Sequence, residues 1–294
     1  MQGNFKYHNP TKLYFGEESL NYLKDELKNY GPTVLLNYGS GTSSQKISNK
    51  SLKKVCNMKR LLILALAALS LTALAQNSPL NQGYKKALFI GAHPDDNESC
   101  AGGTMILLQQ QGCQVVSVYL TSGERGIPGK TLDEAAAIRR LELIDACRLM
   151  NVEYRLMTQI DGQCEVNAQR YQEMLQLIQE EKPDVVFTHW PIDSHRDHRV
   201  CSILVYDAWR LSGKAFDLYY YEAETGMQSK NFIPEAYVNI TSVVEKKHQA
   251  VLCHKSQDPQ EILDDWHAPM ERFRGNESEC SYAEAFTVIH KARN

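Results

Sequence analysis

The stretch ALFIGAHPDDNE, residues 87–98, decides the fold. Its first half, 87–92, is a short apolar run with the length of a buried strand, and His93, Asp95 and Asp96 follow directly. Open sheets of parallel strands bind their ligands at the carboxyl ends of the strands. The stretch therefore predicts an α/β fold and places an imidazole and two carboxylates at its functional edge.

From residue 84 onward, apolar strands alternate with segments of helical periodicity. This alternation is typical of a Rossmann-like, doubly wound α/β fold, a mainly parallel sheet with helices on both faces. We predict strands at 87–92, 115–120, 184–188, 217–221 and 236–240, and helices at 100–112, 133–150, 168–181 and 242–253.

The composition is that of a globular protein and narrows the class of partner. The 294 residues carry a formal net charge of −3 and no long Lys/Arg tract. We therefore expect no nucleic-acid partner, since such partners are met by basic surfaces. The eight cysteines include no Cys-x-x-Cys pair, which argues against a zinc ribbon or a redox motif and favours buried thiols.

Residues 58–75 have the layout of a secretory signal peptide. Met58 and two basic residues precede an apolar run at 61–71, and Ala-Leu-Ala at 73–75 suits cleavage. The run is shorter than the roughly 20 residues that span a bilayer, so we expect no stable membrane span. With Met58 as the true start, the domain 76–294 would be periplasmic or secreted. A buried helix or a signal anchor is the alternative.

The block 1–57 is different in character. Its opening run FKYHNPTKLYFG, residues 5–16, and the later run VLLNYG, residues 34–39, resemble the N-terminus of iron-containing alcohol dehydrogenases over residues 1–40. None of that family's metal ligands follows. We therefore interpret this block as a non-functional fragment, which gives three parts: 1–57, 58–75 and 76–294.

A second cluster of chemically active residues follows the predicted strand 184–188. The run HWPIDSHRDH, residues 189–198, places His195 and His198 three positions apart with Asp197 between them. These side chains can meet His93 at one ion if the two strands are neighbours. Two histidines and one carboxylate with an open fourth position form a catalytic zinc site, and ferrous iron can occupy a similar one. A lone His or Asp at a strand end is more often a helix cap.

The two runs also carry a family resemblance. AHPDDNE, residues 92–98, joined to HRDH, residues 195–198, resembles the LmbE/PIG-L family of N-acetylglucosaminyl deacetylases. The resemblance covers 85–290 and departs from the family pattern at Asn97, which widens the motif by one position. It extends through TSGERG (121–126), RRLE (139–142), KHQA (247–250), HKSQ (254–257) and AEAF (283–286).

This resemblance implies a role for each matching residue. His93, Asp96 and His198 would bind zinc, Asp95 would be the general base, and His195 would stabilise the oxyanion. Asp197 fits a partner that orients His195, as catalytic imidazoles usually require.

Other residues have plainer alternatives. Arg139 would reach the substrate, although an Arg on a periodic helix is usually a surface residue. His254 and Gln257 match a family motif but would equally suit a helix end. The aromatic run 219–221 could stack on a sugar, but aromatic residues in a strand more often belong to the core.

The resemblance implies a zinc-dependent hydrolase that removes an N-acetyl group from an N-acetylglucosamine-type amino sugar or its conjugate. A zinc amidase acting on another acyl amide, or a non-catalytic sugar-binding protein of the same fold, are the alternatives. Specificity would lie in the loops 123–131, 158–167 and 222–235, because loops carry substrate choice in such folds.

Overall fold

The computed structural model describes residues 5–9, 11–15 and 78–290. The chain divides into two compact units, Met1–Lys59 and Arg60–Asn294. In the first unit, β1 (Phe5–Asn9) and β2 (Thr11–Phe15) pair as antiparallel strands. The signal-like segment 58–75 and the run 34–39 lie outside the described residues, so the three-part division of the chain stays a prediction.

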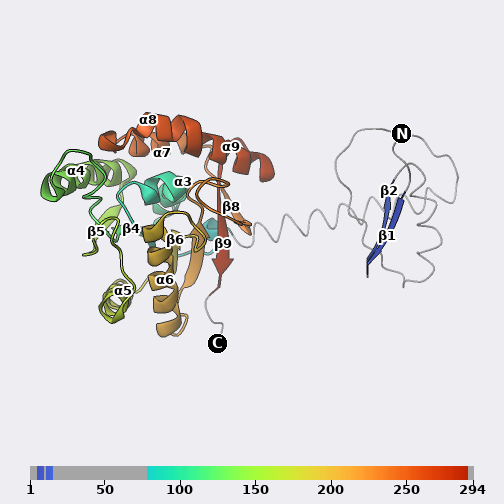
Figure 1. Ribbon diagram of the computed structural model, residues 1–294, viewed down its shortest axis with the longest axis horizontal. Coiled ribbons are helices and arrows are strands. Elements are labelled where there is room, and N and C mark those ends of the chain that lie inside the picture. The colour runs from blue at the N-terminus through green and yellow to red at the C-terminus, as the bar shows by residue number, and fades with distance from the viewer. Residues whose placement is uncertain (1–4, 10, 16–77, 291–294) are drawn as a thin grey trace. The chain divides into compact units, whose positions relative to one another are not determined.

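Seven strands form the sheet of the larger unit, in the order β5-β4-β3-β6-β7-β9-β8 (Figure 1). The strands from β5 to β7 are parallel, whereas β9 runs antiparallel to both of its neighbours. The mainly parallel sheet is thus confirmed, and β3 and β6 are adjacent as the site required. The strands are β3 (Lys86–Gly91), β4 (Gln114–Tyr119), β5 (Glu153–Leu156), β6 (Val185–His189), β7 (Asp217–Tyr221), β8 (Ala236–Asn239) and β9 (Ala283–Ile289).

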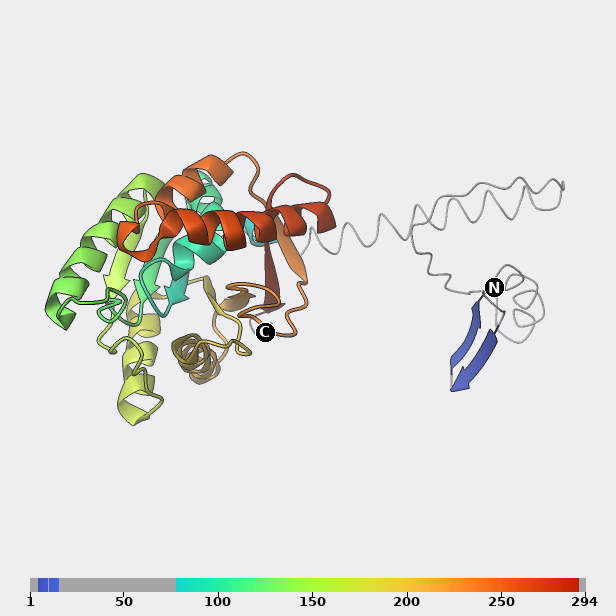
Figure 2. The same ribbon diagram turned by 45° about the horizontal axis from the view of Figure 1, so that its top comes forward.

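Helices cover both faces of this sheet, as Figure 2 shows from a second direction. Alternate side chains of a strand point to opposite faces. Leu88 and Ile90 of β3 pack in the same core as α5 and α6, while Phe89 packs in the core that contains α3, α4 and α7. The helices are α3 (Asp96–Gln110), α4 (Leu132–Met150), α5 (Ala168–Glu181), α6 (Arg196–Leu211), α7 (Val244–Val251), α8 (Pro259–Ile262) and α9 (Ala268–Glu277).

Several elements differ from the prediction. The helix expected at 100–112 spans Asp96–Gln110. Its first turn is polar and lies at the site, so this turn has no apolar period from which the earlier start could be predicted. The elements β5, α6, α8, α9 and β9 had no predicted counterpart. Among the described residues, no helix combines the length and apolarity that a membrane crossing needs.

Helix α3 is broken at Ala101, whose φ of −146° is not helical. A break frees amides that would otherwise bond within the helix. Glu284 on β9 accepts them: its carboxylate lies 2.8 Å from the backbone nitrogens of Gly103 and Thr104. Lys247 of α7 lies 2.7 Å from the same carboxylate. The first turn of α3 can therefore take the orientation that the site needs, while the remainder of the helix packs in the core.

The thiols and the aromatic run both belong to the interior. Seven cysteines among the described residues are free, five of them buried, and burial raises the pKa of Cys147, Cys164 and Cys201 above the usual range. The side chains at 219–221 are also buried. The core role is thus confirmed for the aromatic run and for the five buried thiols, whereas Cys253 and Cys280 are partly exposed.

Asn97, the departure from the family pattern, ties three strands together. Its fully buried side-chain amide donates to the carbonyl oxygens of Phe89 and Val118 at 2.9 and 3.1 Å and to Ser117 Oγ at 3.0 Å. Its Oδ1 accepts from the Tyr221 hydroxyl at 3.0 Å. Asn97 therefore joins β3, β4 and β7 directly below the site.

We expect Asn97→Ala to lower the free energy of unfolding by about 2–4 kcal/mol, because it leaves several buried polar groups without a partner. Urea unfolding monitored by circular dichroism measures this. Gln172→Ala, which truncates an exposed amide on α5, is the control and should change the midpoint little. An equally small change for Asn97→Ala would contradict the proposed cross-link.

Candidate active site

A tight turn between β3 and α3 builds the centre of the site. A Cβ at Gly91 would lie 2.9 Å from both the Asn97 side-chain oxygen and the Asp96 Cβ, so only glycine permits this close approach. Asp95 has a φ of 115°, a conformation that costs about 1–3 kcal/mol and is typical of functional sites. The turn is held by Asp96 Oδ2, which accepts from the backbone nitrogens of Ala92 and His93 at 2.9 and 2.7 Å.

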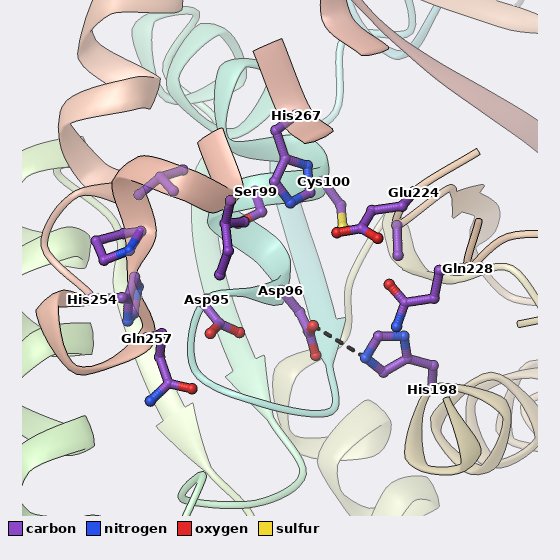
Figure 3. Close-up of a pocket in the computed structure, with 14 residues that line it drawn as sticks. Asp95, Asp96, Ser99, Cys100, His198, Glu224, Gln228, His254, Gln257 and His267 are labelled. Carbon is purple, nitrogen blue, oxygen red and sulfur yellow. Dashed lines mark ion pairs between the residues drawn. The ribbon is translucent and has the colours of Figure 1, made fainter. Parts of the chain in front are cut away.

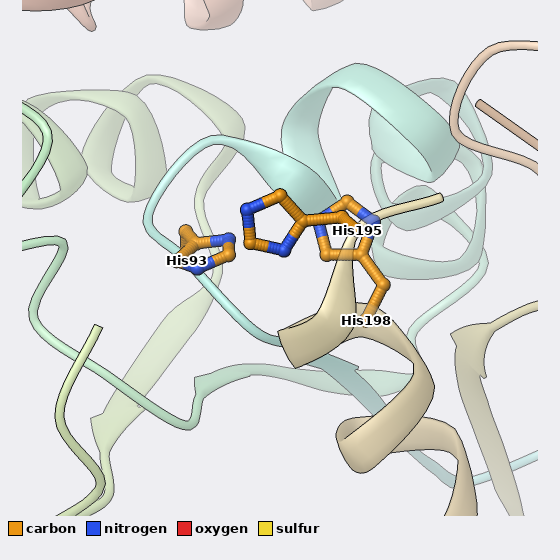
Figure 4. A group of neighbouring side chains, drawn as sticks. All are labelled: His93, His195 and His198. Carbon is orange, nitrogen blue, oxygen red and sulfur yellow. The ribbon is translucent and has the colours of Figure 1, made fainter. Parts of the chain in front are cut away.

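Three of the predicted residues meet at this turn. Asp96 Oδ1 lies 3.2 Å from His198 Nε2, and Asp96 Oδ2 lies 3.4 Å from His93 Nδ1. The His93 and His198 rings are 5.5 Å apart between centroids, with His195 beside both (Figure 4). The sheet order thus brings the predicted ligands from β3 and α6 together.

The donor set fits a metal ion. Ligand atoms held at about 2.0–2.1 Å from a tetrahedral ion lie about 3.3 Å from one another. Asp96 meets the two histidines through different oxygens, at 3.2 Å for His198 and 3.4 Å for His93, and each contact agrees with this spacing. Ligand atoms within 4.8 Å of one another come from His93, His195 and His198 in one group and from Asp96, His189 and His198 in another. The predicted ligands are drawn from these two overlapping groups. Two imidazoles and one carboxylate leave a fourth position for a reactant, so His93, Asp96 and His198 could hold a divalent cation of the catalytic type.

The partner of Asp197 differs from the prediction. Its carboxylate Oδ2 lies 3.4 Å from His93 Nε2 and accepts from the Gly162 amide at 2.6 Å. Within residues 78–290, the one hydrogen bond that the His195 ring accepts comes from the backbone N–H of Asp197. The Asp197 carboxylate therefore orients the candidate metal ligand His93 and not the His195 ring.

Three further residues, which the sequence prediction did not assign, support the ligands. Asp161 Oδ1 lies 3.1 Å from His93 Nε2, and Asp193 Oδ1 lies 3.3 Å from His198 Nδ1. His189 stacks on His198 with ring centroids 3.8 Å apart. The only sequence signal for His189 was its position at the end of a buried strand; Asp161 lies in a loop and had none.

The surrounding carboxylates govern the charge of the two candidate imidazole ligands. Burial alone would lower both pKa values. Contacts with Asp161, Asp197 and Asp96 outweigh it and raise the pKa of His93 well above its usual value. Asp96 and Asp193 likewise raise the pKa of His198 to about 9. The site therefore attracts positive charge.

His195 is placed to donate a hydrogen bond. Its Nδ1 accepts the Asp197 backbone N–H at 3.3 Å, so the neutral ring carries its hydrogen on Nε2. Burial, followed by the charges of His198 and His93, lowers the pKa of His195 and keeps this ring neutral. His195 also lines a hollow together with His93, Asp95 and Arg139.

Arg139 is buried, with 1% of its surface exposed, and it holds Asp95. Its Nη2 donates to Asp95 Oδ2 at 2.8 Å and to the Pro94 carbonyl. The alternative of a solvated surface Arg is therefore wrong. Arg139 also lines the same hollow as Asp95. Its contact with substrate stays a prediction.

Two further family motifs, 139–142 and 254–257, contact each other near Asp95. Glu142 accepts from the Ser256 backbone and hydroxyl at 2.7 and 2.8 Å, which fixes the segment containing His254 and Gln257. His254 is buried, and neither of its ring nitrogens has a hydrogen-bond partner among the described residues. Figure 3 shows His254, Gln257, Asp95 and Asp96 around one hollow.

Comparison with known proteins defines the class. Residues 88–209 match the model of the PIG-L family, described as GlcNAc-PI de-N-acetylase. Residues 88–209 therefore form a domain of the PIG-L/LmbE family, as the motifs predicted.

Individual relatives refine this placement. The diacetylchitobiose deacetylase of Thermococcus kodakarensis is 29% identical over 235 residues, which cover 72% of this chain and 86% of that protein. The structure of N,N'-diacetylchitobiose deacetylase from Pyrococcus horikoshii has a TM-score of 0.65 and 26% identity, covering 72% of this chain and 86% of that one. A 4-oxalmesaconate hydratase of Pseudomonas putida is 25% identical over 199 residues, 61% of this chain and 76% of that protein.

We expect Asp197→Asn to weaken zinc binding about 10- to 100-fold, because a ligand that loses its carboxylate partner is less basic and less well oriented. Titration of chelator-stripped protein against a chromophoric zinc indicator measures this affinity. Asp133→Asn, at an exposed position of α4, should leave it unchanged. Unaltered affinity in Asp197→Asn would show that its contact with His93 does not support a metal.

Proposed function

We propose that the chain is a metal-dependent hydrolase that removes the acetyl group from the nitrogen of an N-acetylglucosamine-type sugar or its conjugate. Zinc is the proposed ion, with ferrous iron as the alternative. The observation that carries the proposal is the position of Asp95, which lines two adjoining hollows beside the His93, Asp96 and His198 cluster. The deacetylase relatives support it.

The residues divide the chemistry of amide hydrolysis between them. A divalent cation held by His93, Asp96 and His198 would supply Lewis acidity and lower the pKa of a bound water. Asp95 accepts a proton from the attacking water and passes it to the departing amine. His195 Nε2–H donates to the acyl oxygen as negative charge develops there, and one such donor is typically worth about a hundred- to a thousand-fold in rate.

Arg139 fixes the carboxylate that moves the proton. Its hydrogen bonds to Asp95 Oδ2 and the Pro94 carbonyl leave the other oxygen, Oδ1, for the reacting water. Such positioning matters, because small displacements of a catalytic group cost large factors in rate.

The hydratase relative makes addition of water to a carboxylate-bearing alkene the second candidate. The electrostatics of the central hollow disfavour it. Asp95, Asp96 and Glu224 line that hollow, and its described lining includes no Lys or Arg. A neutral acetamido sugar suits this surface better than a polyanion does. Another acyl amide remains a third substrate class, and a non-catalytic sugar-binding protein would not need Asp95 in its strained conformation.

The segment 58–75 adds a proposal about location. Its signal-like layout supports export of the domain 76–294 to the periplasm or the medium. Amino-sugar conjugates outside the cell would then be the available substrates.

We expect zinc-loaded full-length protein to release acetate from N,N'-diacetylchitobiose, and chelated protein to release none. Asp95→Asn should lower the rate about a hundred- to ten-thousand-fold while keeping bound zinc, because only the proton acceptor is lost. An enzymatic acetate assay and metal analysis provide the two readouts. Turnover that survives both chelation and Asp95→Asn would sink the mechanism, and hydration of an unsaturated acid without acetate release would favour the second candidate.

We expect Arg139→Lys to lower kcat about 10- to 100-fold with little change in KM, because lysine cannot hold Asp95 and the Pro94 carbonyl in the same geometry. Arg140→Lys, at the exposed neighbouring position, is the control and should match the unaltered enzyme. A raised KM with unchanged kcat would instead assign Arg139 to substrate binding alone.

A further inference from the structure

Hollows adjoin one another along the candidate active site. The central one, of about 160 Å³, contains Asp95, Asp96 and His198 (Figure 3). A wider one, of about 370 Å³, shares Glu224 with it. Glu224 therefore stands between the reacting centre and a second space that the mechanism does not use.

The second hollow has an unusual lining for a protein surface. Trp266 and Phe273 are 37% and 50% exposed and are joined by Pro269 and Met270, with the carboxylate of Asp265 beside them. Large apolar side chains gathered on a surface mark a binding site. Flat aromatic faces with carboxylates at their edge match a pyranose ring, which presents C–H groups on its faces and hydroxyls around its rim.

Trp266 and Phe273 form an aromatic platform, and Phe273 packs against a fixed cation. The Arg274 guanidinium lies 5.0 Å from the centre of the Phe273 ring. Two hydrogen bonds of 2.6 Å from Arg274 to the buried Glu222 carboxylate fix the guanidinium. Preformed sites of this kind lose little entropy when a ligand binds.

The segment Leu263–His267 connects the two hollows. It forms a π-helical turn, a feature found frequently at functional sites. Within it, His267 lines the central hollow and the adjacent Trp266 lines the second one. A ligand bound on Trp266 is thus next to the reacting centre.

Glu224 completes the connection. Its backbone oxygen accepts from the Gln228 and Ser229 amides at 2.8 Å, which fixes the turn that presents it. Within residues 78–290, no group hydrogen-bonds to its carboxylate. That carboxylate is therefore available to the hydroxyls of a ligand that occupies both hollows.

We propose that the hollow lined by Trp266 and Phe273 binds the sugar residue attached to the reacting N-acetylglucosamine, so that the substrate class is an oligosaccharide and not a free monosaccharide. This inference rests on the proposed function, since it takes the reacting sugar to lie beside Asp95. The aromatic platform binds the second ring, and Glu224 receives hydroxyls between the two.

Steady-state deacetylation of two substrates tests the subsite. We expect Trp266→Ala to lower kcat/KM for N,N'-diacetylchitobiose about tenfold, equivalent to about 1.4 kcal/mol. The value for N-acetylglucosamine should stay within about twofold, because the monosaccharide does not reach the platform. Trp266→Phe should restore most of the disaccharide activity. Tyr206→Ala, which removes another partly exposed aromatic residue on α6, should change neither value.

Two results would overturn the subsite. One is an equal loss on both sugars in Trp266→Ala. The other is a change of its sedimentation behaviour relative to unaltered protein, which would assign the aromatic face to a contact between subunits.

Calorimetry of disaccharide binding to Asp95→Asn protein separates this inference from the proposed function. Binding that needs Trp266 supports the subsite even if no amino sugar is deacetylated. Acetate release without any contribution of Trp266 to binding or turnover overturns the subsite and leaves the proposed function intact.

Discussion

The Asp96 carboxylate is the constraint on which the rest of the site depends. One oxygen accepts the Ala92 and His93 amides, which locks the end of β3 to the start of α3. The other faces His198 on α6, the helix that follows β6. Because both oxygens are committed, the turn cannot relax, and Asp95 is held at a positive φ with its side chain toward the adjoining hollows. Fixed geometry of this kind is what a proton acceptor next to a cation requires.

The charges around this constraint suit a cation better than protons do. Asp161, Asp193 and Asp197 lie against the two candidate imidazole ligands. Asp161 and Asp197, with Asp96, raise the pKa of His93 well above its usual value, and Asp96 and Asp193 raise the pKa of His198 to about 9. These groups therefore favour positive charge between them. A divalent ion satisfies the same preference while leaving the imidazoles neutral, the state in which they are ligands. His189, whose pKa burial lowers to about 4, contributes an uncharged wall behind them.

The sequence predicted the parts of this arrangement that follow a period or a short motif. The runs at 87–98 and 189–198 marked the strand ends, and the parallel order of β3 and β6 brought His93, Asp96 and His198 together. It could not predict contacts that depend on the path of a loop. Asp161 reaches His93 from an irregular segment, and Asp197 faces His93 because α6 begins there. The platform at Trp266 depends on a short π-helical turn, which has no apolar period of its own.

The insertion of β9 between β7 and β8 also bears on the order in which the domain assembles. Strand β8 has no other neighbour in the sheet, so it must wait for a segment that is synthesised later in the chain. The same segment carries Glu284, which accepts the amides freed by the break in α3. Pairing between distant segments is slow. We therefore expect closure of the sheet to be a late event in folding, and the helix that presents Asp96 to acquire its final shape when the sheet closes.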